Sequence, residues 1–242
     1  MAGPLVLLLL WAAVSYTGLA NRVLLPSPSD VFRAVVQIVR TMSFWQDLAA
    51  TLYRLVAGFG PAAVLGTAIG LALGASRKAS DSLEFVIDFF RSVPASALFP
   101  AFMLFLGIGD TAKVSVVTFS CLLVIILYTI YGVRNCSEHR KRVAKVLRAG
   151  RMATFAKVIL PDSLPHIFAG IRISVSIALV LVVVTEMFIG TKHGVGRLIY
   201  DSQLMFRVPT MYGAILITGV LGYAINKGFV ALETRVLHWT GK

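Results

Sequence analysis

Three ionisable residues, Arg91, Arg172 and Glu186, interrupt stretches of the sequence that are otherwise apolar. A charge within an apolar membrane segment is costly, so it normally faces a polar cavity or pairs with another charge. Arg91 can attract an anion into such a cavity or pair with Asp88. Glu186, beside Thr185, can line or close a cavity, and pairing with Arg172 is the alternative. These residue types suit solute recognition better than bond-breaking chemistry.

Two serines and a proline follow Arg91 closely. Pro94 removes a backbone donor and bends a helix. Ser92 and Ser96 offer hydroxyl groups near that bend, although serine also hydrogen-bonds within helices. We therefore predict a polar path lined by Arg91, Ser92, Pro94, Ser96, Thr185 and Glu186.

Neither a catalytic centre nor a metal site is predicted. The sequence has no paired carboxylates, no Ser/His/Asp set and no G-x-x-x-x-G-K-[ST] phosphate loop. Its four histidines lack metal-ligand spacing, and its two cysteines, Cys121 and Cys136, are expected to pack rather than to form a disulfide. We expect no metal and no cofactor in this chain.

Composition places these residues in a membrane. Of 242 residues, 57% are hydrophobic and 14% charged, with mean hydropathy +0.83. That is too much apolar surface for an ordinary soluble core. We predict one all-α, polytopic membrane domain, residues 1–242, with about six transmembrane helices. The expected spans are 3–20, 47–75, 83–107, 113–133, 165–190 and 211–232.

The N-terminal part contains two expected helices of different kinds. The small residues Gly18 and Ala20 resemble a signal cleavage site, but no Lys or Arg precedes the first apolar run, so we favour a retained span. Ser27 can cap a helix that has Pro28 at its first position and Asp30 three residues after the cap. This amphipathic helix, 28–44, is expected to lie along the membrane surface.

Small residues recur every fourth position in the span 47–75, at Ala62, Gly66, Gly70 and Gly74. Such a stripe lets helix backbones approach closely. The alternative is that the stripe has no packing role and reflects only the high frequency of glycine in membrane helices.

Positive charge is concentrated in one loop. The net charge is +12, and eight of the 23 Lys and Arg lie between Arg134 and Lys157, flanked by apolar runs. This position excludes nucleic-acid binding and indicates a cytoplasmic loop, 134–164, with both chain termini on the cytoplasmic side. Its helical apolar faces predict a docking element, and a juxtamembrane helix bound to anionic lipid is the simpler alternative.

The sequence of this loop resembles the EAA loop of ABC-importer permeases. That loop typically reads E-A-A, three residues, G, nine residues, I-x-L-P. The matching residues here are Arg142, Val143, Ala144, Leu147, Arg148, Ala149, Gly150, Arg151, Val158, Ile159, Leu160 and Pro161. Further segments agree in order over about residues 24–240: 25–28, 91–94, 105–113, 185–186 and 194–199. Together they resemble permeases of the nitrate, sulfonate, taurine and bicarbonate type.

The resemblance implies a type I ABC-importer permease fold in which the loop forms a cytoplasmic coupling helix. It also implies two ATPase copies, an extracytoplasmic solute-binding protein, and a second permease copy that gives a homodimer in the bacterial inner membrane. ATP and Mg would bind to the ATPase. Members of the family handle inorganic anions, organosulfonates, aromatic acids and uncharged vitamin precursors, and we favour a small organic or inorganic anion as the solute. The coupling residues would be Arg142, Val143, Ala144, Leu147, Arg148, Ala149, Gly150, Arg151, Leu160 and Pro161.

Two positions depart from the family pattern. Arg142 stands where the family usually has Glu, and Arg148 stands where it usually has the hinge Gly, with Gly150 two residues later. Our hypothesis is that the cognate ATPase offers acidic residues to Arg142, because reversing an interface charge costs several kcal/mol otherwise. A weakened or specialised permease is the alternative. Outside this family, a secondary transporter or a membrane enzyme without an ATPase remains to be considered.

Overall fold

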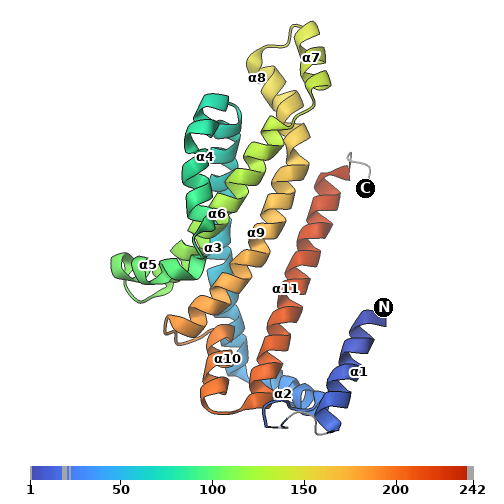
Figure 1. Ribbon diagram of the computed structural model, residues 1–242, viewed down its shortest axis with the longest axis vertical. Coiled ribbons are helices and arrows are strands. Elements are labelled where there is room, and N and C mark those ends of the chain that lie inside the picture. The colour runs from blue at the N-terminus through green and yellow to red at the C-terminus, as the bar shows by residue number, and fades with distance from the viewer. Residues whose placement is uncertain (1, 18–20, 22, 239–242) are drawn as a thin grey trace. The chain divides into compact units, whose positions relative to one another are not determined.

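The computed structural model describes residues 2–17, 21 and 23–238. Every regular element within these residues is a helix (Figure 1). In chain order the elements are α1 (Ala2–Tyr16), α2 (Pro28–Arg40), α3 (Met42–Gly74), α4 (Arg77–Ser92), the 3₁₀ helix η1 (Ala95–Leu98), α5 (Phe99–Leu106), α6 (Asp110–Arg134), α7 (Glu138–Val146), α8 (Arg151–Thr154), the π-helix η2 (Phe155–Ile159), α9 (Leu160–Phe188), α10 (Val195–Leu204) and α11 (Val208–Val236).

Four helices among the described residues are long and apolar enough to cross a membrane: α3, α6, α11 and the continuous stretch Arg151–Phe188. Arg77–Ser92 and Ala95–Leu106 qualify together as a fifth, broken span. The apolar helix Leu5–Tyr16 is shorter than the roughly 20 residues that cross a bilayer. Residues 18–20 of the expected first span lie outside the described residues. The predicted all-α membrane fold class is confirmed.

The break near Pro94 is sharper than the bend expected within 83–107. The helices on its two sides meet at 91°. Val93, with φ −76° and ψ 124°, and Pro94, with φ −56° and ψ 125°, are both extended. A residue before proline avoids the helical region because its backbone meets the proline ring, so α4 ends here. Pro100 instead lies in the first turn of α5, where a missing N–H costs nothing.

Contacts divide the chain into two compact units. The first contains Met1–Tyr53 and Val183–Tyr223, and the second contains Arg54–Val182 and Ala224–Lys242. The helices α3, α9 and α11 contribute residues to both units.

In the first unit, α2 begins as its sequence predicts. The Ser27 hydroxyl accepts a hydrogen bond from the N–H of Asp30 at 3.2 Å and donates one to the Asp30 carboxylate at 2.6 Å. A Cβ on Gly213 of α11 would lie 3.2 Å from Ile38 and 3.3 Å from Val35 of α2. Helix α2 therefore packs its apolar face closely against the start of α11 (Figure 1).

In the second unit, the glycine stripe of α3 is the contact surface for α6. A Cβ added to Gly66 would lie 3.0 Å from Ile125, and one on Gly70 would lie 2.5 Å from Thr129. Gly74 approaches Val133 in the same way, at 2.7 Å. Close packing along this face is therefore confirmed, and the stripe extends back to Gly58, 2.8 Å from Val117.

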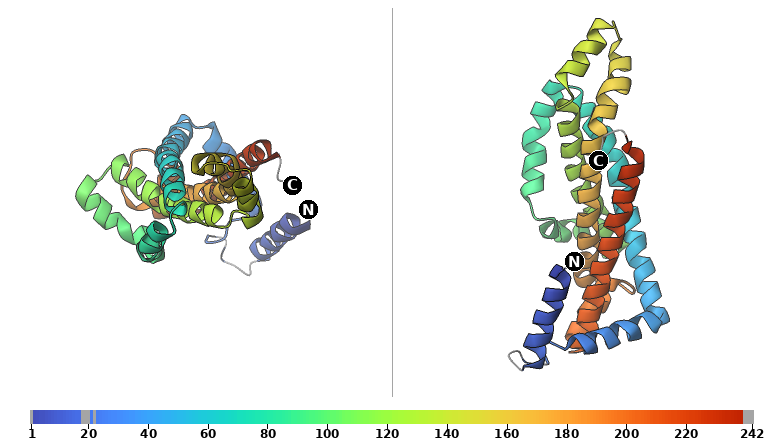
Figure 2. Two further views of the ribbon diagram at one scale, coloured as in Figure 1. Left: turned by 90° about the horizontal axis from the view of Figure 1, so that it is seen from above. Right: turned by 90° about the vertical axis from the view of Figure 1, so that its right-hand side faces the viewer.

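Helix α6 also packs against α9 and α4. Gly170 of α9 lies under Tyr128 of α6, at 2.5 Å from an added Cβ. On another side, Ile87 of α4 joins Ile126 and Ile130 of α6 in a buried cluster. Figures 1 and 2 show α7 and α8 beyond the ends of α6 and α9. The bundle thus supports the loop that the sequence marked for docking.

Gly70→Ala is expected to lower the stability of this bundle by about 1–3 kcal/mol, because its Cβ overlaps Thr129 and the α6 backbone. Gly60→Ala, on the same helix with nothing within 4 Å of an added Cβ, is the matched control. The stability of the Gly60→Ala variant should not fall. The midpoint of unfolding in an SDS titration measures both, and equal effects would contradict close packing at Gly70.

Candidate functional site

The predicted coupling segment folds into two short helices joined by a tight turn. Helix α7 contacts the π-helix η2, and Ala144 of α7 is buried, at 3% exposure. The other predicted coupling residues from Arg142 to Arg151 are exposed, while Leu160 and Pro161 are half-buried at the start of α9. The structure therefore brings this group of residues together on one projecting element.

Four large apolar side chains are exposed on this element. Val143 is 45% exposed, Val146 81%, Leu147 74% and Met152 79%. Arginines 142, 148 and 151 lie among them in the sequence and are also exposed. An apolar patch with a charged rim is typical of a surface that binds another protein.

The turn after α7 is a Schellman motif with arginine in place of glycine. The N–H of Ala149 donates to the carbonyl of Ala144, and the N–H of Arg148 donates to that of Lys145, both at 3.0 Å. Arg148 has φ +54°, in the left-handed region that glycine occupies at least cost. Glycine at this position in the family pattern thus has a conformational reason, and Arg148 keeps the fold of the turn with some strain.

Arg148→Gly is expected to stabilise this turn by about 1 kcal/mol, because glycine removes the left-handed penalty. Arg142→Gly removes the same charge from the helix interior and should instead destabilise α7 by about 1 kcal/mol. Hydrogen–deuterium exchange of the α7 amides measures both changes. Faster exchange in Arg148→Gly would show that the arginine side chain, rather than the backbone, holds the turn.

Asp162 fixes the base of the loop. Its carboxylate accepts a hydrogen bond from the N–H of Ser137 at 2.8 Å and forms an ion pair with Arg140. Cys136 is buried beside it, and burial together with the neighbouring Asp162 carboxylate raises the pKa of the Cys136 thiol to about 11. Both cysteines are free and buried, which agrees with a packing role.

A five-residue π-helix, Phe155–Ile159, joins the loop to α9. The N–H of Leu160 donates to the carbonyl of Phe155, five residues back. Pro161 has no N–H, so the regular helical ladder is already interrupted at this point. Wide turns of this kind bend helices and are frequent at functional sites.

The residues of the expected polar path lie in two different units. Arg91, Ser92, Pro94 and Ser96 are exposed around the break between α4 and η1. Arg91 pairs with Asp88 at 3.2 Å, as the alternative interpretation expected, and the Ser92 hydroxyl donates to the Asp88 carbonyl at 2.8 Å. The side chains of Arg91 and Asp88 are 56% and 50% exposed, so their ion pair contributes little to stability.

Glu186 belongs to a buried network in the first unit. It is 1% exposed, and its carboxylate accepts hydrogen bonds from the Thr51 hydroxyl and from the N–H of Gly196, each at 2.9 Å. Thr51 in turn accepts from the N–H of Val195 at 2.9 Å. Asp47 accepts from the N–H of Gly194 at 2.9 Å.

Three consecutive N–H groups at the start of α10 are therefore satisfied by side chains from α3 and α9. The first turn of a helix leaves these donors unpaired and carries partial positive charge, which favours carboxylate partners. The two glycines permit this approach. A Cβ on Gly194 would lie 2.5 Å from the Glu186 carboxyl carbon, and one on Gly196 would lie 2.2 Å from the Val183 carbonyl oxygen. The network makes Glu186 a fixed anchor for α10.

The alternative interpretation, in which Glu186 pairs with Arg172, is wrong. Arg172 pairs with Glu233 of α11, at 3.2 Å, within the second unit. Sequence reasoning also missed Asp47 and Thr51, although two polar residues four apart in an apolar helix form one face and are a usable signal. It also missed a second charged group, in which the buried Arg54 and Lys113 approach the half-exposed Asp110 at 2.8 and 3.6 Å.

Comparison with known proteins agrees with this geometry. Residues 63–238 match the family model described as binding-protein-dependent transport system inner membrane component. The chain is 28% identical to the taurine transport system permease protein of Escherichia coli, over 98% of this chain and 88% of that protein. It is 32% identical to the nitrate import permease protein of Leptolyngbya laminosa, over 78% of this chain and 67% of that protein.

A solved structure has the same fold. An inward-facing structure of the MetNI methionine ABC transporter contains a chain that aligns with a TM-score of 0.65 at 18% identity. The alignment covers 85% of the present chain and 97% of that one. At this level of identity the similarity concerns the helical fold alone.

Proposed function

The chain belongs to the family of binding-protein-dependent transport system inner membrane components, and we propose that it moves a small anion inward in partnership with separate ATPase subunits. It is a permease subunit, and the energy for transport comes from other chains. The observation that supports this most strongly is the projecting segment of α7 and α8. Its exposed Val143, Val146, Leu147 and Met152 need a protein surface to cover them.

The proposed assembly has two copies of this permease, two ATPase subunits and one extracytoplasmic solute-binding protein. ATP and Mg bind to the ATPase, because the sequence of this chain has no phosphate loop. Closure of the ATPase pair pushes on the coupling residues, and α9 carries the movement into the membrane. Asp162 and the π-helix link the loop to α9, so they transmit this movement.

We place the α7–α8 segment and both termini in the cytoplasm. Eight Lys and Arg between Arg134 and Lys157 support this orientation, since basic loops remain on the cytoplasmic side. Because the turn 194–197 resembles the family's outer loop, we propose that it is extracytoplasmic and that the binding protein docks there.

An anion is the proposed solute. The names of two relatives specify taurine and nitrate, which supports an organic sulfonate or an inorganic oxyanion for this chain. We propose that the path passes the α4–η1 break, where Arg91, Ser92 and Ser96 are exposed beside Pro94. Because the Arg91–Asp88 pair is exposed and weak, Arg91 can exchange Asp88 for a passing anion. Thr185 and Glu186 hold the outer gate at α10.

Purification of the tagged chain from its host membranes, with mass spectrometry of the partners, tests this proposal. We expect an ATPase with a phosphate loop in equal amount, and ATP-dependent uptake of a sulfonate or nitrate after reconstitution with it. Recovery of the chain alone, in several detergents and after crosslinking, would overturn the proposal in favour of a secondary transporter or a membrane enzyme.

A further inference from the structure

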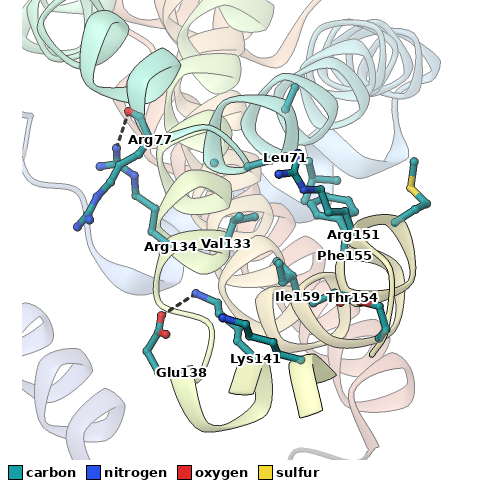
Figure 3. A pocket seen from close by; sticks show the side chains of 16 residues that line it. Leu71, Arg77, Val133, Arg134, Glu138, Lys141, Arg151, Thr154, Phe155 and Ile159 are labelled. Carbon is teal, nitrogen blue, oxygen red and sulfur yellow. Dashed lines mark hydrogen bonds and ion pairs between the residues drawn. The ribbon is translucent and has the colours of Figure 1, made fainter. Parts of the chain in front are cut away.

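A basic cavity of about 1120 Å³ lies in the second unit, beside the base of the α7–α8 segment (Figure 3). It is bounded by the ends of α3 and α6, the start of α4, and the helices α7 and α8 with η2. Five cationic side chains and a single carboxylate, Glu138, line it. The cations are Arg77, Arg134, Lys141, Lys145 and Arg151.

In the part of the chain that the structure describes, two of these cations have acidic partners. Lys141 binds Glu138 at 3.0 Å, and Arg134 pairs with Asp81 and also donates to the carbonyl of Arg77 (Figure 3). Within the described residues, Arg77, Lys145 and Arg151 have no ion pair. Their charges therefore add to a positive potential that the walls of the cavity concentrate.

The donors in the cavity suit an oxyanion. Arginine presents a planar fork of N–H groups that matches phosphate, and lysine adds a compact charge. Arg134 keeps a buried Nε without an acceptor. The Thr154 side chain also lines the cavity, but its hydroxyl donates to the carbonyl of Ala149 at 3.4 Å, so the donors for an oxyanion are the basic side chains.

The walls are amphipathic, and the cavity lies at the end of the bundle. Apolar residues Leu71, Val133, Phe155 and Ile159 line it together with the cations. Two of the membrane-spanning helices, α3 and α6, end beside it, so it lies where lipid headgroups meet water. A cavity of about 1120 Å³ is larger than one free phosphate fills. A phospholipid headgroup together with the start of its acyl chains needs both cationic and apolar residues in the lining, and this cavity has both.

We propose that this cavity binds the phosphate group of an anionic phospholipid, with free phosphate as the other possible source of the same chemistry. The site is independent of the transported solute. A bound headgroup neutralises Arg77, Lys145 and Arg151 and so contacts α4, α7 and α8 at once. It therefore ties the projecting α7–α8 segment to the bundle.

The test uses the double variant Arg77→Gln/Lys145→Gln of the full chain. Both side chains are exposed and lack acidic partners, so folding should be retained. The matched control is Lys78→Gln/Lys157→Gln, which removes the same charge from residues outside the cavity. Arg77→Lys/Lys145→Arg keeps the charge and should bind as the unmodified chain does.

Native mass spectrometry measures the dissociation constant of the first bound phosphatidylglycerol, with phosphatidylcholine as the neutral lipid. At about 1 kcal/mol for each basic residue, loss of two should weaken binding about 30-fold in the cavity variant. The control and the charge-retaining variant should stay within about threefold of the unmodified chain. This outcome assigns the site to lipid.

Calorimetric titration with inorganic phosphate, in nanodiscs of phosphatidylcholine alone, tests the other source. Phosphate binding that the cavity variant loses and the control keeps, without preference for phosphatidylglycerol, assigns the site to a free anion. The proposal is overturned if neither ligand binds, or if the cavity variant and the control lose binding equally.

Discussion

Gly196→Ala is expected to displace the start of α10 and to lower the stability of the first unit by about 3 kcal/mol, the upper end of overpacking costs. The added Cβ would lie 2.2 Å from the carbonyl oxygen of Val183 and 2.8 Å from the Glu186 Cβ. The carbonyl belongs to the α9 backbone and cannot turn away. Relief therefore requires α10 to move, which breaks the hydrogen bond from the Gly196 N–H to Glu186.

Gly219→Ala is the matched control for this change. Gly219 lies in α11 of the same unit, with nothing within 4 Å of an added Cβ, so stability should be unchanged or slightly higher. Thermal unfolding in detergent, together with uptake in reconstituted vesicles, measures the two variants. Equal stability of both would mean that α10 does not pack on the Val183 carbonyl as described.

The same network explains why Glu186 tolerates burial. A buried carboxylate is stable only when its oxygens are hydrogen-bonded, and here Thr51 and Gly196 supply donors. Removal of the carboxylate leaves those donors without their partner, which costs about 1–3 kcal/mol. Such an anchor fixes the start of α10, and it requires no direct contact with solute.

Local patterns in the sequence predicted much of the fold. The spacing of Gly66, Gly70 and Gly74 predicted a close helix contact because four residues make about one helical turn. Ser27 and Asp30 predicted the start of α2 because both partners of that cap lie within one turn. The apolar periodicity of 140–157 similarly predicted helical structure in this loop, where α7, α8 and η2 form.

Long-range pairing was not predictable in this way. Thr51 and Glu186 are separated by 135 positions, so no local pattern connects them. Arg172 had several possible carboxylate partners, and the choice of Glu233 depends on how α9 and α11 pack. The 91° break at Pro94 was larger than expected, because proline restricts its preceding residue without specifying how far the chain turns.

Arg142 offers the most informative change on the proposed ATPase-facing surface. Arg142 is exposed on α7, and it lies two residues before the buried Ala144, so the two side chains point to nearly opposite sides of the helix. If the cognate ATPase carries acidic groups there, Arg142→Glu places like charges together at an interface, which costs several kcal/mol. We expect about 100-fold weaker ATPase binding, corresponding to about 2.8 kcal/mol, and loss of solute-stimulated hydrolysis.

A graded series separates charge from shape at this position. Arg142→Gln should give an intermediate loss, because it removes attraction without adding repulsion. Lys78→Glu makes the same reversal on α4, outside the predicted coupling residues, and should leave binding unchanged. Stronger stimulation of the ATPase by Arg142→Glu would contradict the hypothesis and would mean that the partner retains basic groups. Arg142 would then weaken the coupling contact, and the exposed apolar residues Val143 and Leu147 would supply most of the binding energy.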